Sequence, residues 1–296
     1  MKSIKNTLLL LAATLVWACH PAKTTNEATN ADFVYHEEQV CGKDAPTIVF
    51  IHGLGCDLNT WKYQREAFKD YNLVFVDLPG FGQSAKPEVD YTLDYYASAI
   101  HGVLAGLSRE AGKVILVGHS LGSAICRQYV FNYPDEVAAL VDIDGVYCLY
   151  PQDTTSCDYA DYTAAVEGFA SSFDTDSIRA VFQGFVSSLA GPETPQEVND
   201  YAMSVMPNTS RHVAASTMKN LINKENWTGA VINRPSLIIC TQNSGLAPDN
   251  RQQMEALYSC LQYEELLTCG HFIHMERAEW FNEILHQFLI RLQNER

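Results

Sequence analysis

A serine stands at the centre of the stretch Gly118-His119-Ser120-Leu121-Gly122, the strongest candidate for chemistry in this chain of 296 residues. The apolar, β-branched run at 113–117 predicts a strand before it, and residues 123–129 have the apolar spacing of a helix after it. A Gly-x-Ser-x-Gly turn between a strand and a helix exposes the serine hydroxyl above the sheet, and the helix N-terminus favours developing negative charge there. We therefore predict that Ser120 is a catalytic nucleophile.

A serine hydroxyl is a weak nucleophile unless a base takes its proton, and histidine is the usual base. Among the nine histidines of the chain, His271 fits best because it follows Gly270 just past the last predicted strand. His274 is the nearby rival, which we expect to pack at the start of the closing helix. We expect His52 and His119 to brace their loops rather than transfer protons.

Short apolar runs alternate with helical patterns along most of the chain, which predicts an α/β fold with parallel strands joined by crossovers. Residues 147–232 break this alternation, because they contain helical patterns but no strand. We expect them to form a helical cap inserted into a core of residues 33–146 and 233–296. The predicted strands are 47–51, 73–76, 113–117, 137–143, 236–240 and 263–267, the core helices are 91–107, 250–257 and 280–292, and the cap helices are 158–173, 177–189, 195–206 and 211–222.

From about residue 33 onward, the chain resembles the α/β-hydrolase family in four motifs that stand in the order of the family. His52-Gly53-Leu54-Gly55 resembles its oxyanion loop, and residues 77–84 (Asp-Leu-Pro-Gly-Phe-Gly-Gln-Ser) resemble the turn after the next strand. Residues 118–122 resemble its nucleophile elbow, and residues 270–276 resemble the segment with its catalytic histidine. The resemblance implies a mostly parallel sheet of the eight-stranded type with flanking helices.

The resemblance also implies which backbone groups stabilise the transition state. In this family an oxyanion hole is formed by backbone N–H groups of the oxyanion loop and of the residue after the nucleophile. Those positions are Leu54 and Leu121 in this chain. We expect their N–H groups to bind the negative oxygen of a tetrahedral intermediate.

The acid that would orient the histidine is where the chain departs from the common pattern of the family. The usual place is just after the strand at 236–240, but residues 241–248 contain no carboxylate. Some relatives, haloalkane dehalogenases among them, carry the acid at the end of the strand that follows the elbow helix, where Asp144 stands. We predict Asp144, while Asp249, Asp142 and a dyad without a carboxylate stay open as alternatives.

A serine nucleophile excludes the mechanism of dehalogenases and epoxide hydrolases, in which a carboxylate attacks carbon, and leaves acyl chemistry. The expected function is hydrolysis of a small neutral or partly apolar carboxylic ester through an acyl-serine intermediate. Hydrolysis of a C–C, amide or peptide bond, and ligand binding without catalysis, stay open as alternatives. The formal net charge of −15 argues against nucleic acid as a partner. No Cys/His spacing suggests zinc, and no metal or dissociable cofactor is expected.

The first residues have the features of an export signal. Lys2 and Lys5 precede an apolar stretch that runs to Ala18 and is too short to span a bilayer. Val16-Trp17-Ala18-Cys19 resembles the lipobox of bacterial lipoproteins, which predicts removal of residues 1–18 and lipid attachment at Cys19; ordinary signal-peptidase cleavage nearby is the alternative. Residues 19–32 read as a polar tether. We expect an exported cell-envelope protein, anchored through its lipid in the periplasm or at the outer membrane.

Eight further cysteines follow Cys19, and an even number in an exported protein permits disulfides without fixing their pairing. Cys148 and Cys157 are close enough in sequence to close one loop. Cys126 lies in a predicted buried helix, where a free thiol that packs as a small apolar group is at least equally consistent with the sequence.

Overall fold

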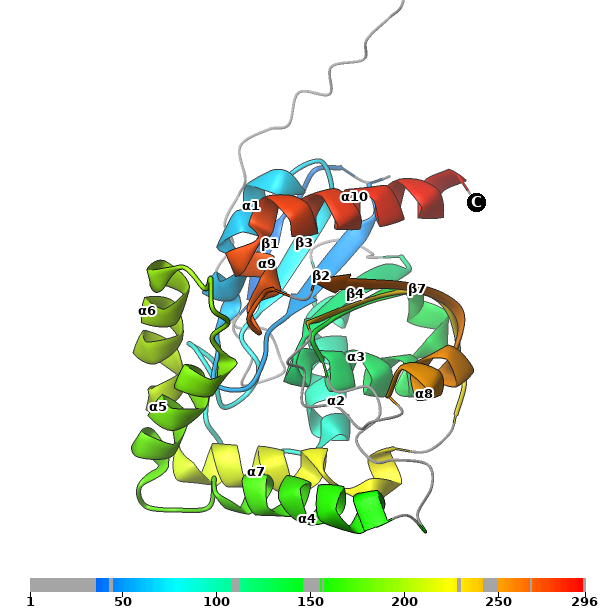
Figure 1. Cartoon of the computed structure of the whole chain (residues 1–296). Helices are drawn as coiled ribbons and strands as arrows, with labels where there is room; N and C mark the ends of the chain where they lie inside the picture. Colours follow the sequence, from blue (N-terminus) through cyan, green and yellow to red (C-terminus); the bar gives the residue numbers. More distant parts are fainter. Residues whose placement is uncertain are drawn as a thin grey trace, which may run out of the picture.

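The computed structural model describes residues 36–42, 45–107, 112–145, 155, 157–227, 230–241, 250–266 and 268–294. Within these residues a central sheet has helices on both faces, and a group of helices packs at one side of this layered core (Figure 1). The predicted α/β architecture is confirmed.

The described residues form seven strands in one sheet, in the order β1-β3-β2-β4-β5-β6-β7. β2 to β7 pair in parallel, and β1 pairs antiparallel with β3 at one edge. The central strands are mostly apolar because helices cover both of their faces. The bounds are β1 His36–Gln39, β2 Thr47–Ile51, β3 Asn72–Val76, β4 Val114–His119, β5 Val137–Ile143, β6 Ile232–Thr241 and β7 Tyr258–Leu266.

Two apolar clusters fill the space on the two faces of the sheet. Successive residues of a strand point to opposite faces, so Phe50 joins one cluster and Val49 and Ile51 join the other. One cluster includes Phe281 and Leu285 of α10, and the other includes side chains of α2 and α3. The core helices are α1 Lys62–Ala67, α2 Leu93–Ala105, α3 Leu121–Asn132, α8 Asn250–Leu257, α9 Ile273–Glu276 and α10 Ala278–Asn294, with short 3-10 helices η1 Leu58–Trp61 and η2 Pro134–Glu136.

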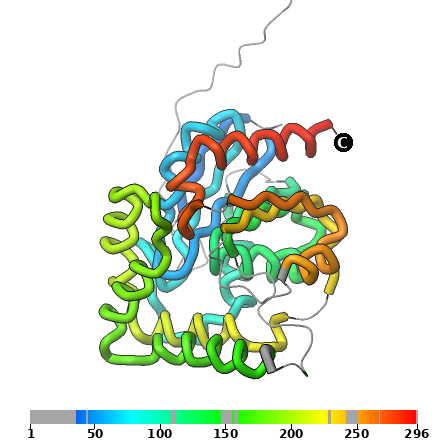
Figure 2. The backbone as a smooth tube through the Cα atoms, in the orientation of Figure 1, coloured from blue at the N-terminus to red at the C-terminus, as the bar shows by residue number. Residues whose placement is uncertain are grey.

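Four helices follow one another between β5 and β6, and we call them the helical insertion (Figure 2). The first and last residues of each helix are within two positions of the bounds predicted from the sequence. The insertion packs directly on the loop after β2, since a Cβ at Gly55 would lie 3.1 Å from both Met206 Cβ and Phe182 Cε1. Its elements are α4 Cys157–Ser171, α5 Ile178–Leu189, α6 Gln196–Val205 and α7 Arg211–Leu221, with 3-10 helices η3 Met206–Asn208 and η4 Lys224–Asn226.

Several predictions from the sequence fall outside the described residues. These are the export signal, the tether, the lipid site at Cys19 and the pairing of the Cys148 and Cys157 side chains. Cys126 is a buried free thiol in α3, one of the two alternatives for this residue. Among the described helices, none has the length and apolar character to cross a membrane.

Candidate active site

Ser120 lies at the sharp turn between β4 and α3, with backbone angles of φ 55° and ψ −117°. This region of backbone space is costly for a residue with a side chain and persists only where the surroundings enforce it. Gly118 and Gly122 make the turn possible. A Cβ at Gly118 would lie 2.5 Å from the backbone of Gly122, and one at Gly122 would lie 2.3 Å from the carbonyl oxygen of Ile51.

Asp144 contacts His271, and this pair joins the end of β5 to the loop before α9. Asp144 Oδ2 accepts a hydrogen bond from His271 Nδ1 at 2.6 Å. Its other oxygen, Oδ1, accepts from the N–H of Thr241 at 2.9 Å and from the Thr241 hydroxyl at 3.1 Å. The carboxylate is 1% exposed and the imidazole 16% exposed. With φ 41°, Asp144 shares with Ser120 a positive φ that no other non-glycine residue has in the described part of the chain.

The structure does not bring the alternative carboxylate Asp142 to the histidine. Asp142 is fully buried, and its Oδ2 accepts a hydrogen bond from the hydroxyl of Tyr258 at 3.3 Å. Burial raises the pKa of Asp142 to about 8, in spite of the nearby guanidinium of Arg127. Asp249, the other alternative, lies outside the described residues.

A closed ring of hydrogen bonds links the segments that carry Ser120, Asp144 and His271. The N–H of Ser120 donates to the carbonyl of Ile143 at 3.0 Å, and Ile143 directly precedes Asp144. Asp144 contacts His271, and the carbonyl of His271 accepts a hydrogen bond at 2.9 Å from Nε2 of His119. His119 directly precedes Ser120. The strand ends β4 and β5 and the loop before α9 therefore bring the three predicted residues together, although they are 24 to 151 positions apart.

The loop at 52–55 packs against Ser120. A Cβ at Gly53 would lie 3.0 Å from Ser120 Cβ, so a larger residue here would force its neighbours to shift by a few tenths of an ångström. Leu54 follows Gly53, and Leu121 is the first residue of α3. Within the described residues, neither the Leu54 N–H nor the Leu121 N–H donates to a protein acceptor. Both amides are thus available to a ligand on this side of Ser120.

Three further histidines surround this ring and stay neutral. Burial lowers the pKa of His52 to about 4 and the pKa of His274 to about 3, and it also lowers the pKa of His119. His52 donates from Nδ1 to the Gly53 carbonyl at 2.8 Å and accepts at Nε2 from the N–H of Leu78 at 3.0 Å. His274 contacts the Thr60 hydroxyl at 2.8 Å. These contacts brace the loops around Ser120.

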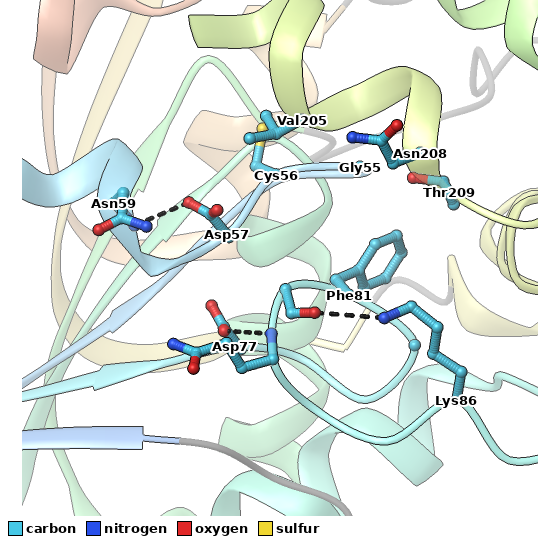
Figure 3. A pocket seen from close by; sticks show the side chains of 13 residues that line it. Gly55, Cys56, Asp57, Asn59, Asp77, Phe81, Lys86, Val205, Asn208 and Thr209 are labelled. Carbon is cyan, nitrogen blue, oxygen red and sulfur yellow. Dashed lines mark hydrogen bonds between the residues drawn. The ribbon is translucent and has the colours of Figure 1, made fainter. Parts of the chain in front are cut away.

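A cavity of about 300 Å³ lies between residues 55–59, residues 77–86 and the helical insertion (Figure 3). Asp77 lies at its edge, and burial raises the pKa of its carboxyl to about 6. Its two oxygens accept from the N–H groups of Leu58 and Gln83, both at 2.7 Å. This cavity is not lined by Ser120, Asp144 or His271. We therefore assign Asp77 a structural role, in which its carboxyl joins residues 55–59 to residues 77–86. The described residues contain no group of three or more His, Cys, Asp or Glu side chains placed to hold a metal ion.

Residues 46–278 match the α/β hydrolase fold family, and the chain belongs to this family. Human protein ABHD8 is 25% identical over 255 residues, which are 82% of this chain and 55% of ABHD8. Across the first curated relatives it matches, the chain spans 28% to 55% of their length.

Two solved structures illustrate how closely the fold is shared. An esterase from Thermogutta terrifontis has a TM-score of 0.75 at 19% identity, over 92% of this chain and 99% of that protein. An epoxide hydrolase from an endophytic Streptomyces has a TM-score of 0.73 at 20% identity, over 92% of this chain and 96% of that protein. Because these proteins carry different activities on one fold, the function of this chain must be argued from its own site.

One residue of the site was not singled out from the sequence. Thr241 ends β6 and holds Asp144 with both its N–H and its hydroxyl. Its position at the end of the strand beside β5 was the available signal, because the carboxyl ends of neighbouring parallel strands meet at one edge of a sheet.

Proposed function

We propose that the protein is a serine hydrolase in which Ser120 is the nucleophile, His271 the base and Asp144 the acid that orients the histidine. The observation that carries this proposal is the 2.6 Å contact between Asp144 Oδ2 and His271 Nδ1 within the ring of contacts that includes Ser120. A hydrogen bond at Nδ1 leaves the opposite nitrogen, Nε2, free of a proton and able to accept one. This is the protonation state that a base needs.

The chemistry follows from these positions. Ser120 Oγ attacks the carbonyl carbon of the ester and gives its proton to His271 Nε2. The electron pair of the carbonyl moves to its oxygen, where the N–H groups of Leu54 and Leu121 stabilise the negative charge. The intermediate then collapses, the bond to the alcohol oxygen breaks, and the alcohol leaves with the proton from His271. Water attacks the acyl-serine by the same route and releases the carboxylic acid.

Proton transfer requires Ser120 and His271 to approach each other in the substrate complex. Among the described residues, neither Ser120 Oγ nor His271 Nε2 has a hydrogen-bond partner. Catalytic hydrogen bonds are often long in enzymes without substrate and shorten in the complex. Asp144 contacts the imidazole at Nδ1, and Ser120 Oγ takes part in none of the contacts described above, so rotation of the Ser120 side chain toward Nε2 would break none of them.

The substrate class follows from charge and from the nucleophile. Serine rather than a carboxylate at position 120 favours attack on an acyl carbon over attack on an epoxide. The net charge of −15 disfavours strongly anionic substrates at long range. Leu54, a residue of the loop at 52–55, has an apolar side chain that is 6% exposed. We infer a small neutral or partly apolar carboxylic ester.

Hydrolysis of p-nitrophenyl esters with acyl chains of increasing length tests this function, with the matching anilides as the amide comparison. We expect saturable ester hydrolysis that prefers short acyl chains and is lost in Ser120→Ala. Folded wild-type protein that hydrolyses none of the esters, or a Ser120→Ala variant with undiminished activity, would contradict the proposal.

We also propose that Cys19 carries a lipid that holds the protein at the cell envelope. The support is the sequence at 16–19 and the polar tether of residues 19–32. Metabolic labelling with a fatty-acid analogue tests it. Label on the wild type but not on Cys19→Ser is the expected result, and an unlabelled wild type would contradict it.

A further inference from the structure

The loop that carries His271 is held on both sides by one buried carboxylate, that of Glu276 at the end of α9. Glu276 Oε2 accepts from the N–H of Gly270 at 3.0 Å, and Oε1 accepts from the N–H of Phe272 at 3.1 Å. These are the residues directly before and after His271. Glu276 is 6% exposed, and a buried carboxylate is stable only when such donors satisfy it. Hydrogen bonds to a charged acceptor are also the strongest kind, so the loop is firmly fixed.

The segment that joins α5 to α6 contacts the same loop from the side of the helical insertion. The Thr194 hydroxyl donates to Glu276 Oε2 at 2.7 Å and accepts from the N–H of Gly191 at 2.8 Å. The N–H of His271 itself donates to the carbonyl of Leu189 at 2.9 Å. The insertion therefore bonds directly to the backbone of the proposed catalytic base.

Two glycines allow the backbones of the insertion and the loop to touch. A Cβ at Gly270 would lie 2.6 Å from Glu276 Oε1 and 2.6 Å from the Gly191 nitrogen. A Cβ at Gly191 would lie 2.7 Å from the Gly270 nitrogen. Any side chain at either position would thus separate the insertion from the loop.

We propose that Glu276 is a positioning residue for His271. Through Thr194 and the Leu189 carbonyl, the helical insertion also takes part in positioning His271. The inference rests on the proposed serine-hydrolase function. A base misplaced by about 1 Å loses about 10²-fold in rate. The insertion therefore helps to fix the backbone from which the base extends.

The substitution Glu276→Gln is informative because an amide has only one oxygen. The side chain would keep one acceptor and turn an NH₂ group toward the N–H of either Gly270 or Phe272. We expect kcat to fall about 10²-fold with little change in KM, since ground-state contacts to substrate are untouched. Thr194→Val removes one donor to the carboxylate, and we expect a loss of about tenfold. Thr194→Ser keeps the hydroxyl and should restore most of the activity.

Glu193→Gln is the matched control. Glu193 also links the insertion to the core, through an ion pair with Arg277 at 2.5 Å, but its side chain is 65% exposed and does not contact the His271 loop. We expect wild-type kcat for this variant. A Glu276→Gln or Thr194→Val variant with the kcat of Glu193→Gln would overturn the positioning role.

Hydrogen exchange of the backbone amides in residues 268–276 gives a readout that does not depend on activity. We expect faster exchange in Glu276→Gln and in Thr194→Val but not in Glu193→Gln. Unchanged exchange in both variants would overturn the proposed positioning role, whatever the activity of the variants. A wild-type protein whose ester hydrolysis does not depend on Ser120 would instead overturn the proposed function, so the two failures are distinguishable. If Glu276→Gln does not fold, the pair Thr194→Val and Thr194→Ser carries the same test.

Discussion

Replacing Asp144 with asparagine tests the proposed triad through the protonation state of His271. The carboxylate accepts at both oxygens, from Thr241 at Oδ1 and from His271 Nδ1 at Oδ2. The N–H of Thr241 is a backbone donor that cannot reverse. The amide oxygen of the introduced asparagine would therefore face Thr241, and its NH₂ group would face Nδ1 of His271. Nδ1 would then have to accept, which moves the proton to Nε2.

A histidine protonated at Nε2 cannot take the proton of Ser120, so the loss falls on the chemical step. The equivalent change in a serine protease of a different fold lowers kcat about 10⁴-fold. Such a loss corresponds to about 5.5 kcal/mol of transition-state stabilisation. The Asp144–His271 pair has a carboxylate that is 1% exposed and a contact of 2.6 Å, and we expect a loss of the same order if it serves the proposed triad.

The assay is steady-state ester hydrolysis by wild type, Asp144→Asn and Asp249→Asn, with thermal unfolding as the check on folding. We expect Asp144→Asn to be folded with kcat reduced about 10⁴-fold, and Asp249→Asn to be close to wild type. A folded Asp144→Asn with kcat within about tenfold of wild type would refute the reasoning. If Asp249→Asn alone were inactive, the acid would be Asp249.

Three further predictions concern the surroundings of the site. Burial raises the pKa of Asp142 to about 8, so the folded chain keeps a proton that the unfolded chain releases above about pH 4. The free energy of unfolding of the wild type should therefore fall relative to that of Asp142→Asn as the pH rises from about 4 to 8, because Asp77 and the buried histidines titrate alike in both proteins. Parallel urea-unfolding results for the two across this range would contradict the prediction. Gly55→Ala would bring a Cβ to 3.1 Å from Met206 Cβ, at a residue whose φ is +75°. This substitution should destabilise the fold by about 1–3 kcal/mol. An unchanged melting temperature would count against the packing of the insertion on this loop. Thr241→Val removes the hydroxyl donor at 3.1 Å from Asp144 but keeps the backbone donor, so kcat should fall several-fold and far less than in Asp144→Asn; a loss as large as that of Asp144→Asn would show that the backbone bond alone does not hold the carboxylate.

The sequence predicted the elements that carry a periodic apolar signal. The helices of the insertion and the central strands were found because their apolar residues recur at helical spacing or in buried runs. β1 was missed because its four residues, His-Glu-Glu-Gln, contain no apolar side chain, and this strand forms by pairing with β3. β7 begins at Tyr258, earlier than predicted, because α8 ends at Leu257 without a glycine or proline to mark the boundary.

The residues that stand in recognisable motifs could be read from the sequence, and those that act only through long-range contacts could not. Ser120 belongs to a local turn whose glycines are visible in the sequence. Thr241 and Glu276 act through residues that the fold brings to them, such as Asp144 for the first and Thr194 for the second. The meeting of the insertion with the His271 loop involves segments about 80 residues apart, and no local pattern indicates it.

Mapping the adduct of a fluorophosphonate probe by peptide mass spectrometry tests most directly whether Ser120 is an activated nucleophile. The probe reacts with serines that a neighbouring base has made nucleophilic. We expect one adduct, on the peptide that contains Ser120, with no labelling in Ser120→Ala and strongly slowed labelling in His271→Ala. Folded wild-type protein that takes up no probe, or labelling of Ser120 at an undiminished rate in His271→Ala, would contradict the account.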